Sequence, residues 1–306
     1  MSIAMLFPGQ GSQSPASGAP WRDDPSWSLV ERASTATGVD VAHLLLDAGE
    51  DELRDTANAQ LSTFVVSLVV AEAARRDGLH AEHAAGHSLG EYTALVAGGA
   101  VEFEEGCRLV AARGAAMRAA SAERPGTMAA IIGLEEHVVA DACSASGQEV
   151  WVANDNAPGQ VVVAGAQAGI DAITPVLKAA GGRAPMPLKV AGAFHTPYMA
   201  SAQTALDHAL HQTEFRSTDV ELWANVDAAQ HDDPASWPSV LSDQLCSAVR
   251  WRDEIDAMAR AGVTAFVELG PGNVLAGMVK RIAPDAVRAS AATPEQVAQV
   301  VASLTG

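Results

Sequence analysis

The distribution of apolar and polar positions along the chain predicts a mixed α/β protein. Residues 3–7 form a short apolar run that stops at a proline and a glycine, as a buried strand does. Residues 62–76 carry the strongest helical pattern, with valines at 65, 66, 69 and 70 on one face. We expect further strands at 81–85, 221–225 and 265–269, further helices at 27–37, 41–46, 51–55, 91–97, 103–119, 200–212 and 251–261, and a polar loop at 228–237.

A different pattern begins after the turn at residues 124–126. Strand, helix, strand, strand, helix and strand are expected in turn at residues 128–132, 135–146, 150–153, 160–164, 168–180 and 183–188. This β-α-β-β-α-β order is the ferredoxin-like arrangement. The sequence therefore predicts a small ferredoxin-like subdomain of residues 126–188, inserted in a larger α/β lobe made of residues 1–125 and 189–306.

Composition excludes several classes of function. The chain has 306 residues, of which 48% are apolar, and can bury a large core. The longest apolar stretch, residues 64–71, is much shorter than the ~18–20 residues that span a bilayer, so no membrane helix is expected. A formal charge of −18 argues against nucleic-acid binding, which needs clustered lysine and arginine.

The cysteines and the first residues bear on the compartment. Cys107, Cys143 and Cys246 have the spacing of neither a disulfide framework nor a metal site, so we expect thiols in a reducing cytoplasm and no metal. No basic lead or cleavage-site pattern precedes Pro8, and no secretory signal is expected.

Residues 86–90, Gly-His-Ser-Leu-Gly, provide the first candidate chemistry. At a strand-to-helix turn, a G-x-S-x-G pentapeptide exposes a serine hydroxyl, because its glycines let the strand and the helix approach closely. Ser88 is therefore the candidate nucleophile. The amide of Leu89, at the start of the next helix, points at an oxyanion formed beside that serine. The pentapeptide alone is also compatible with a purely structural turn.

Three other polar residues are candidates for the same site. Gln10 follows the first strand, at the carboxyl end where open α/β sheets bind ligands, although a surface turn explains it equally well. His195 lies where a helix begins and can serve as general base for Ser88; the alternative is a surface histidine. No carboxylate between the two residues lies in a convincing context, so we expect a Ser–His dyad oriented by a backbone carbonyl. Arg113 lies within a predicted helix, where a solvated arginine is the plainer interpretation.

Six motifs follow one another over about 270 residues: FPGQGSQ at 7–13, GHSLGEY at 86–92, Arg113-Gly114 with Met117, NAPGQ at 156–160, Phe194-His195 and ELGPG at 268–272. Together they resemble malonyl-CoA:acyl-carrier-protein transacylases, the acyltransferase family of fatty-acid and polyketide synthesis. The resemblance implies an α/β-hydrolase-like core with a ferredoxin-like insert, in agreement with the pattern of elements.

The resemblance also implies roles for the catalytic candidates. Ser88 is expected to be acylated, His195 to act as its base and later its acid, and the amides of Gln10 and Leu89 to form the oxyanion hole. Arg113 is expected to pair with the free carboxylate of the acyl group, because a planar guanidinium matches a carboxylate through two parallel hydrogen bonds. This expectation replaces the interpretation of a solvated arginine.

Phe194, His87 and Met117 complete the substrate-binding residues that the resemblance implies. Phe194 beside the base looks like the malonyl-selecting version, since a bulky ring leaves little space for a methyl branch on the acyl α-carbon.

The chain departs from the family at three positions. Ala248 stands where proline is usual, Arg250 where glutamine is frequent, and Arg118 replaces a common glutamine. These departures bear on fine specificity. A main-chain carbonyl near Arg250 is still expected to accept the Nδ1 proton of His195, because a carbonyl does not depend on side-chain identity.

The implied reaction is a ping-pong transfer of malonyl from malonyl-CoA, through Ser88, to the phosphopantetheine thiol of an acyl carrier protein, without metal or redox cofactor. A free-standing acyltransferase of a polyketide pathway, using another acyl-CoA or acyl-carrier substrate, remains open. So do two other classes: a serine hydrolase that passes the acyl group to water, and a non-catalytic docking subunit.

An acidic carrier protein and this acidic chain repel each other, so docking requires a local basic patch. Lys280 and Arg281, on a helix expected after residue 272, and Lys189, at the junction of the two lobes, are the candidates for that patch. The alternative is that all three are ordinary solubilising charges.

Overall fold

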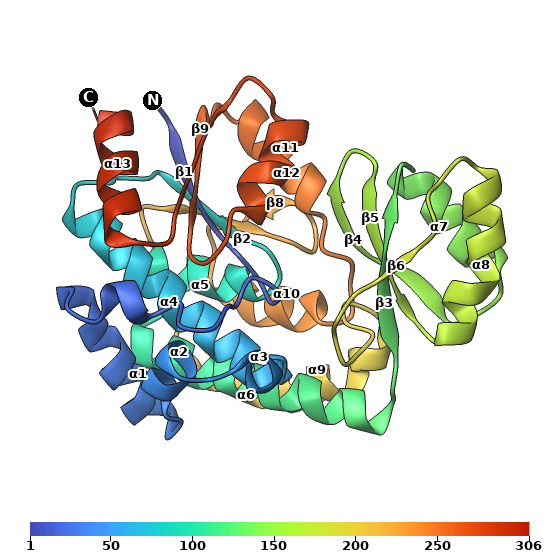
Figure 1. The fold of residues 1–306 in the computed structure, drawn as a ribbon, viewed down its shortest axis with the longest axis horizontal. Coiled ribbons are helices and arrows are strands. Elements are labelled where there is room, and N and C mark those ends of the chain that lie inside the picture. Colours follow the sequence, from blue (N-terminus) through green and yellow to red (C-terminus); the bar gives the residue numbers. More distant parts are fainter. Residues whose placement is uncertain (306) are drawn as a thin grey trace.

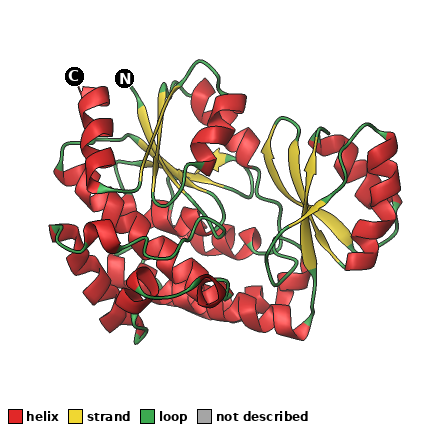
Figure 2. Ribbon diagram, viewed as in Figure 1, coloured by secondary structure: helices red, strands yellow, loops and turns green. Residues whose placement is uncertain are grey.

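The computed structural model describes residues 1–305, which form a mixed α/β structure with two separate sheets (Figure 1 and Figure 2). The larger sheet has the strand order β10-β9-β1-β2-β7-β8, and its neighbours are parallel except for the antiparallel pair β7 and β8. Its strands are β1 (Ile3–Phe7), β2 (His83–Gly86), β7 (Glu221–Ala224), β8 (Ala229–Gln230), β9 (Ala265–Leu269) and β10 (Val287–Ala291).

β1 lies inside this sheet because it is apolar on both faces. Ala4, Leu6 and Phe7 have no exposed surface, as expected of a parallel strand covered by helices on each side. The predicted bounds of β1 and β9 are those observed, and β2 begins two residues later than predicted. The pattern does not predict β10, since that edge strand contains an arginine and a serine and only its last residue is buried.

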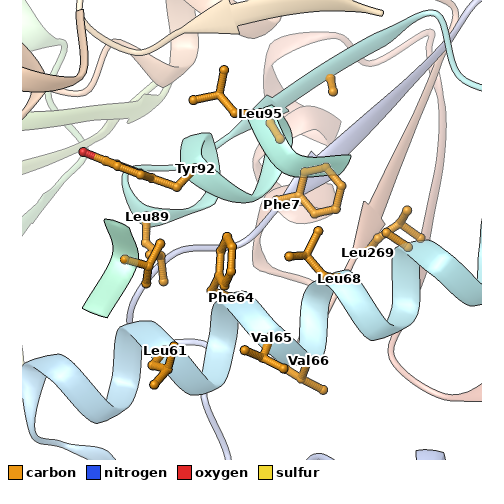
Figure 3. Packing of buried hydrophobic residues seen from close by; sticks show 14 of the residues in the cluster. Phe7, Leu61, Phe64, Val65, Val66, Leu68, Leu89, Tyr92, Leu95 and Leu269 are labelled. Atoms are coloured by element: carbon orange, nitrogen blue, oxygen red, sulfur yellow. The ribbon is translucent and has the colours of Figure 1, made fainter. Parts of the chain in front are cut away.

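The centre of the core is α4 (Thr56–Arg76), which packs beneath the turn that carries Ser88. Phe64 and Leu68 of α4 belong to one hydrophobic cluster with Phe7, Leu89 and Leu269 (Figure 3). Residues from β1, β9 and the helix after β2 therefore meet on one helix, which holds the carboxyl ends of these strands in place.

By length and composition, α4 is the one helix among residues 1–305 that is long and apolar enough to cross a membrane. It begins at Thr56 and not at the predicted residue 62, because the Asp55 side chain accepts hydrogen bonds from the backbone N–H groups of Ala57 and Asn58. Of its most apolar window, 83% is buried inside the protein, so α4 is a core helix of this fold.

The predicted helices around the larger sheet are present, with small shifts at their ends. The pattern predicts no element at α10, α13 or the short strand β8. Of these, β8 lies within the predicted polar loop 228–237. The remaining helices are α1 (Ser28–Thr37), α2 (Val41–Leu46), α3 (Glu50–Leu53), α5 (Leu89–Ala97), α6 (Phe103–Glu123), α9 (Ala200–Gln212), α10 (Trp237–Gln244), α11 (Trp251–Arg260), α12 (Val274–Ile282) and α13 (Pro294–Thr305), with short 3-10 helices η1 (Ala19–Trp21), η2 (Pro25–Trp27), η3 (Pro197–Met199) and η4 (Pro234–Ser236).

The smaller sheet has antiparallel neighbours in the order β4-β5-β3-β6 and carries two helices. Its elements follow in the predicted order: β3 (Thr127–Ile132), α7 (Glu136–Ala145), β4 (Val150–Ala157), β5 (Gln160–Gly165), α8 (Gln167–Ala179) and β6 (Met186–Pro187). Ile131, Val161 and Ile173 belong to a core cluster that is separate from that of the larger sheet.

The last strand, β6, is shorter than the predicted 183–188, since the prolines at 185 and 187 donate no backbone N–H. The α/β class is confirmed, whereas the ferredoxin-like and hydrolase-like labels stay predictions.

The two sheets are joined through the ends of β4 and β6. β6 leads into the loop that carries His195. The Asp155 N–H donates to the Val249 carbonyl at 2.9 Å, and the Val249 N–H donates to the Ala153 carbonyl at 2.9 Å. The segment before α11 is thus hydrogen-bonded to β4, and the smaller sheet is held beside the site described next.

Candidate active site

Ser88 lies at the turn between β2 and α5 in a sparsely populated backbone conformation, with φ +53° and ψ −103°. For a residue other than glycine, such a conformation costs about 1–3 kcal/mol and persists only where the surroundings hold it. The turn is tight: a Cβ at Gly86 would overlap the backbone of Gly90, and a Cβ at Gly90 would overlap the carbonyl of Phe7. The glycines of the pentapeptide are therefore required by the close approach of β1, β2 and α5.

His195 approaches Ser88 from the loop after β6. Its Nε2 lies 2.8 Å from the Ser88 Oγ, and its own backbone has φ +61°. The next residue, Thr196, accepts a hydrogen bond from the Tyr198 N–H at 3.3 Å and donates to the Ala193 carbonyl at 2.6 Å. These contacts order the loop that holds the imidazole against the serine hydroxyl.

The carbonyl oxygen of Gln244 lies 2.8 Å from the Nδ1 of His195. A carbonyl only accepts, so the proton is on Nδ1 and the Nε2 lone pair faces Ser88. The expected position of this acceptor, near Arg250, is wrong. Gln244 is the last residue of α10 and its carbonyl has no partner inside the helix, whereas Arg250 is the N-cap residue of α11 and its side chain pairs with Asp253.

Burial and the positive charge of Arg113 lower the pKa of His195 to about 3. The imidazole is therefore neutral at physiological pH, with a lone pair available for the serine proton. Arg113 lowers the pKa of His195 only while its positive charge is uncompensated. An anion bound to Arg113 would therefore raise that pKa.

Arg113, on α6, is fully buried, so the interpretation of a solvated arginine is wrong. Its Nη2 donates to the Ser88 Oγ at 3.1 Å and to the Gln244 Oε1 at 2.9 Å, and its Nη1 donates to the Gln60 Oε1 at 2.8 Å. The guanidinium carbon lies 5.0 Å from the centre of the Tyr92 ring. α4, α5 and α10 therefore each contribute a side chain that fixes this guanidinium.

The hydrogen-bond partners of Arg113 within residues 1–305 are all neutral, and its buried Nε has no partner there. Burial lowers the pKa of Arg113, and a charge on the buried Glu91 would raise it. Burial raises the pKa of Glu91 to about 8, so this carboxyl is mostly protonated at neutral pH and leaves Arg113 without a counter-charge, which is unfavourable for a buried cation. The site is therefore electrostatically suited to an anionic group within reach of the Ser88 hydroxyl.

The amides of Leu89 and Gln10 belong to segments that meet at Ser88. Leu89 is the first residue of α5, so its N–H has no acceptor inside the helix. Gln10 follows β1 in a turn that packs on the elbow, the strand-to-helix turn of residues 86–90. A Cβ at Gly9 would overlap the carbonyl of His87, and the His87 N–H donates to the Phe7 carbonyl at 3.0 Å. The turn is thus part of the site, and the oxyanion role of the two amides stays a prediction.

Of the other expected substrate contacts, Phe194 and Met117 are buried and His87 is half-buried. Phe194 is 5% exposed and directly precedes the base. The Sδ of Met117, one turn after Arg113 on α6, accepts a hydrogen bond from the Gln60 Nε2 at 3.2 Å. The Nε2 of His87 lies 2.8 Å from the Oδ1 of Asn156, which links the elbow to β4.

The three predicted docking cations lie on the surface. Lys280 and Arg281 are exposed at the end of α12, where Arg281 donates to Gln160 at the start of β5, and Lys189 is exposed just after β6. Within the described residues none of them pairs with a carboxylate, whereas most other exposed arginines do. These cations therefore remain available to an acidic partner at the junction of the two sheets.

Three polar residues of the site are absent from the sequence analysis: Gln60, Gln244 and Asn225. Asn225 carried a usable signal, since it directly follows β7 at the carboxyl end of a buried strand. Gln60 and Gln244 carried none, because a buried glutamine in a helix looks the same in the sequence as a solvated one.

Two surface pockets lie away from Ser88. One, of about 580 Å³, is lined by residues that include Leu68 and Phe103, and the other, of about 720 Å³, by residues that include Asp155 and Arg252. Arg252 is paired with Glu135 in the second pocket. The candidate chemistry is therefore concentrated around the turn of residues 86–90 and not in these two pockets.

The fold and the site define an α/β protein in which a strained serine contacts both a neutral histidine and a buried arginine. Over residues 4–304 the chain matches the family described as the acyl transferase domain. The chain belongs to this family and is an acyltransferase.

The names of individual relatives are more specific than the description of the family. The chain is 34% identical to the malonyl CoA-acyl carrier protein transacylase of Bacillus subtilis, over 99% of this chain and 97% of that protein. The structure of an acyl-carrier-protein S-malonyltransferase from Burkholderia pseudomallei is 36% identical, with a TM-score of 0.94 over 99% of this chain and 100% of that chain. A malonyl-transacylase in complex with a type II PKS acyl-carrier protein is 32% identical, with a TM-score of 0.95 over 99% and 100% of the two chains.

Proposed function

We propose that this acyltransferase moves a malonyl group from malonyl-CoA to the phosphopantetheine thiol of an acyl carrier protein, through an acyl ester on Ser88. The observation that carries the proposal is the buried Arg113, which has neutral partners and lies 3.1 Å from the Ser88 Oγ. An acyl group with a free carboxylate supplies the missing counter-charge, and a guanidinium binds a carboxylate through two parallel hydrogen bonds. The names of the relatives agree with this substrate and this partner.

In the first half-reaction, the Nε2 of His195 takes the Ser88 proton while the serine oxygen bonds to the thioester carbonyl carbon. The carbonyl electron pair moves onto oxygen, where the amides of Gln10 and Leu89 stabilise it. When the carbonyl re-forms, the C–S bond breaks and CoA leaves as a thiol with the proton that His195 holds. The Gln244 carbonyl keeps the imidazole in the required tautomer and stabilises its charged form.

The second half-reaction reverses these steps with another thiol. The phosphopantetheine thiol gives its proton to His195 and bonds to the acyl carbon of the ester. The C–O bond to Ser88 then breaks, and His195 returns the proton to the serine oxygen. No metal or redox change is needed, because every step is a proton transfer or an acyl substitution.

For the carrier protein we propose docking at Lys189, Lys280 and Arg281. The unpaired charges of these residues support the assignment, since an acidic chain attracts an acidic partner only through a local positive patch. The division into a catalytic lobe of residues 1–125 and 189–306 and an inserted subdomain of residues 126–188 belongs to the same proposal, because the carrier then meets both parts. The proposed compartment is the cytoplasm.

Measuring the mass added to the enzyme by malonyl-CoA, methylmalonyl-CoA and acetyl-CoA, mapping the adduct to a peptide, and then adding phosphopantetheinylated carrier protein tests the function. We expect one malonyl group on Ser88 that moves to the carrier. An adduct that disappears at the same rate with and without carrier would identify a hydrolase, and the absence of any adduct would identify a docking subunit.

A further inference from the structure

Asn225, at the carboxyl end of β7, lies directly behind the strained serine and is fully buried. Its Oδ1 accepts the Ser88 N–H at 2.7 Å, and its Nδ2 donates to the Gly86 carbonyl at 2.8 Å. One side-chain amide therefore binds the backbone on both sides of His87. From these contacts we infer that Asn225 is a positioning residue, which holds the elbow in the conformation that brings the Ser88 hydroxyl to His195.

The arrangement requires an amide at position 225. A second hydrogen bond runs from the Asn225 Nδ2 to the Glu254 Oε2 at 2.8 Å. If the Asn225 oxygen and nitrogen exchanged places, the Nδ2 donor would face the Ser88 N–H donor. The Oδ1 acceptor would then face the acceptors of the Gly86 carbonyl and the Glu254 carboxyl. An ionised aspartate of the same shape could accept from Ser88 but could donate to neither of the other two groups.

Asn225 is itself fixed by its backbone. Its N–H donates to the Oε2 of Glu91 on α5 at 2.8 Å, and its carbonyl accepts the Arg250 N–H at 2.9 Å. Glu91 and Glu254 are both fully buried, and burial raises the pKa of Glu91 to about 8. Asn225 thus connects β7, α5 and α11 behind the nucleophile.

The positive φ of Ser88 persists only while contacts of this kind over-determine it. Without the hydrogen bonds of the Asn225 side-chain amide, Ser88 relaxes toward a common backbone conformation, and the 2.8 Å contact between the Ser88 Oγ and His195 is lost. A displacement of about 1 Å at a reacting atom reduces a rate roughly 10²-fold. Asn225 hydrogen-bonds neither Arg113 nor His195 directly, so we expect the loss to fall on the rate of acylation and not on binding.

The inference depends on the proposed function in one respect, namely that Ser88 is the nucleophile. The experiment therefore uses two readouts on the full chain. One is the rate of Ser88 acylation as a function of malonyl-CoA concentration. The other is the rate at which phenylmethylsulfonyl fluoride modifies Ser88, which reports nucleophilicity without any acyl-CoA. If the wild-type enzyme is modified by phenylmethylsulfonyl fluoride but is not acylated by malonyl-CoA, the proposed function is refuted. The rates at which phenylmethylsulfonyl fluoride modifies the variants then decide this inference.

The variants are Asn225→Ala, Asn225→Asp, Glu254→Gln and the double variant N225D/E254Q. Asn58→Ala is the control, since the Asn58 side chain donates to the Glu52 carbonyl and not to Ser88, His195 or Arg113. For Asn225→Ala and Asn225→Asp we expect both rates to fall roughly 10²-fold, with the half-saturating malonyl-CoA concentration unchanged. Glu254→Gln and Asn58→Ala should stay close to wild type, because a glutamine oxygen still accepts from the Asn225 Nδ2.

The double variant separates positioning from folding. A glutamine at 254 donates to the aspartate introduced at 225 and removes one buried carboxylate beside it, so N225D/E254Q should react at least tenfold faster than N225D. Acylation within threefold of wild type in folded Asn225→Ala overturns the inference, as does a loss confined to the half-saturating concentration. If Asn225→Ala does not fold, the absence of recovery in N225D/E254Q overturns it.

Discussion

Replacing Arg113 with alanine removes the guanidinium whose Nη2 lies 3.1 Å from the nucleophile. In the proposed acyl-enzyme, that guanidinium holds the malonyl carboxylate inside a site from which water is excluded. The side chain is fully buried, so bulk solvent does not screen the lost interaction. We therefore expect Arg113→Ala to reduce malonyl loading strongly and to leave acetyl loading intact or faster, because acetyl carries no carboxylate.

The magnitude follows from the contacts. Hydrogen bonds between charged groups are each worth about 1.5–3 kcal/mol, and the geometry offers two to a carboxylate. Water that enters the vacated space recovers part of this energy, which leaves a cost of about 2–4 kcal/mol for malonyl-CoA. This cost corresponds to a decrease in kcat/KM of roughly 30-fold to 10³-fold.

The assay measures kcat/KM for malonyl-CoA and acetyl-CoA side by side, and the ratio of the two values is the decisive quantity. Loss of the Arg113 charge also removes one cause of the low pKa of His195. A bound malonyl carboxylate already compensates that charge, so this effect acts mainly on acetyl loading and moves the ratio in the same direction. Arg108→Ala, an exposed arginine on the same helix, is the matched control. Equal losses for both acyl groups would show that Arg113 supports the structure and does not select the substrate.

The remaining predictions concern the nucleophile, the acyl pocket, the carrier surface and the base. Ser88→Ala should abolish the covalent malonyl adduct and the transfer while leaving the melting temperature nearly unchanged; a malonyl adduct on the variant would contradict the assignment. Wild-type enzyme should prefer malonyl-CoA to methylmalonyl-CoA roughly 10–200-fold in kcat/KM, because Phe194 leaves little room for a methyl branch, and comparable values would refute this selection. Glutamates in place of Lys280 and Arg281 should raise KM for the carrier protein and weaken its salt dependence without affecting loading from malonyl-CoA; unchanged transfer at low salt would place docking elsewhere. Because the pKa of His195 is lowered to about 3 in the free enzyme, its Nε2 stays unprotonated there between pH 8 and pH 5. The kcat/KM for loading, which reports the free enzyme, should therefore change by less than about threefold over that range. A histidine at its ordinary pKa of about 6.5 would lose roughly 30-fold by pH 5, so a decrease of that size would contradict the lowered value.

Local patterns in the sequence determined much of the fold. β1 and β9 could be predicted to the residue, because strands buried on both faces are continuously apolar and are bounded by proline, glycine or polar turns. β10 and β8 could not, since these edge strands bury too little surface to leave a clear pattern, and α10 could not, since its 8 residues are too few for a clear periodicity. The start of α4 was missed for another reason: the cap at Asp55 lies before the apolar stripe on which the prediction was based.

At the site, the sequence alone pointed to Ser88, because the glycines that a strand-to-helix turn requires are close to it in the chain. The resemblance added the expected role of Arg113, but not its environment. Its partners Gln60 and Gln244 lie 53 and 131 residues away in the chain, so only the packing of α4, α6 and α10 brings them together. The same packing decided which carbonyl faces His195, made Arg113 a buried cation without a counter-charge, and placed Asn225 behind the nucleophile. Burial and charge compensation are properties of the assembled tertiary structure, and no periodicity in a single chain reports them.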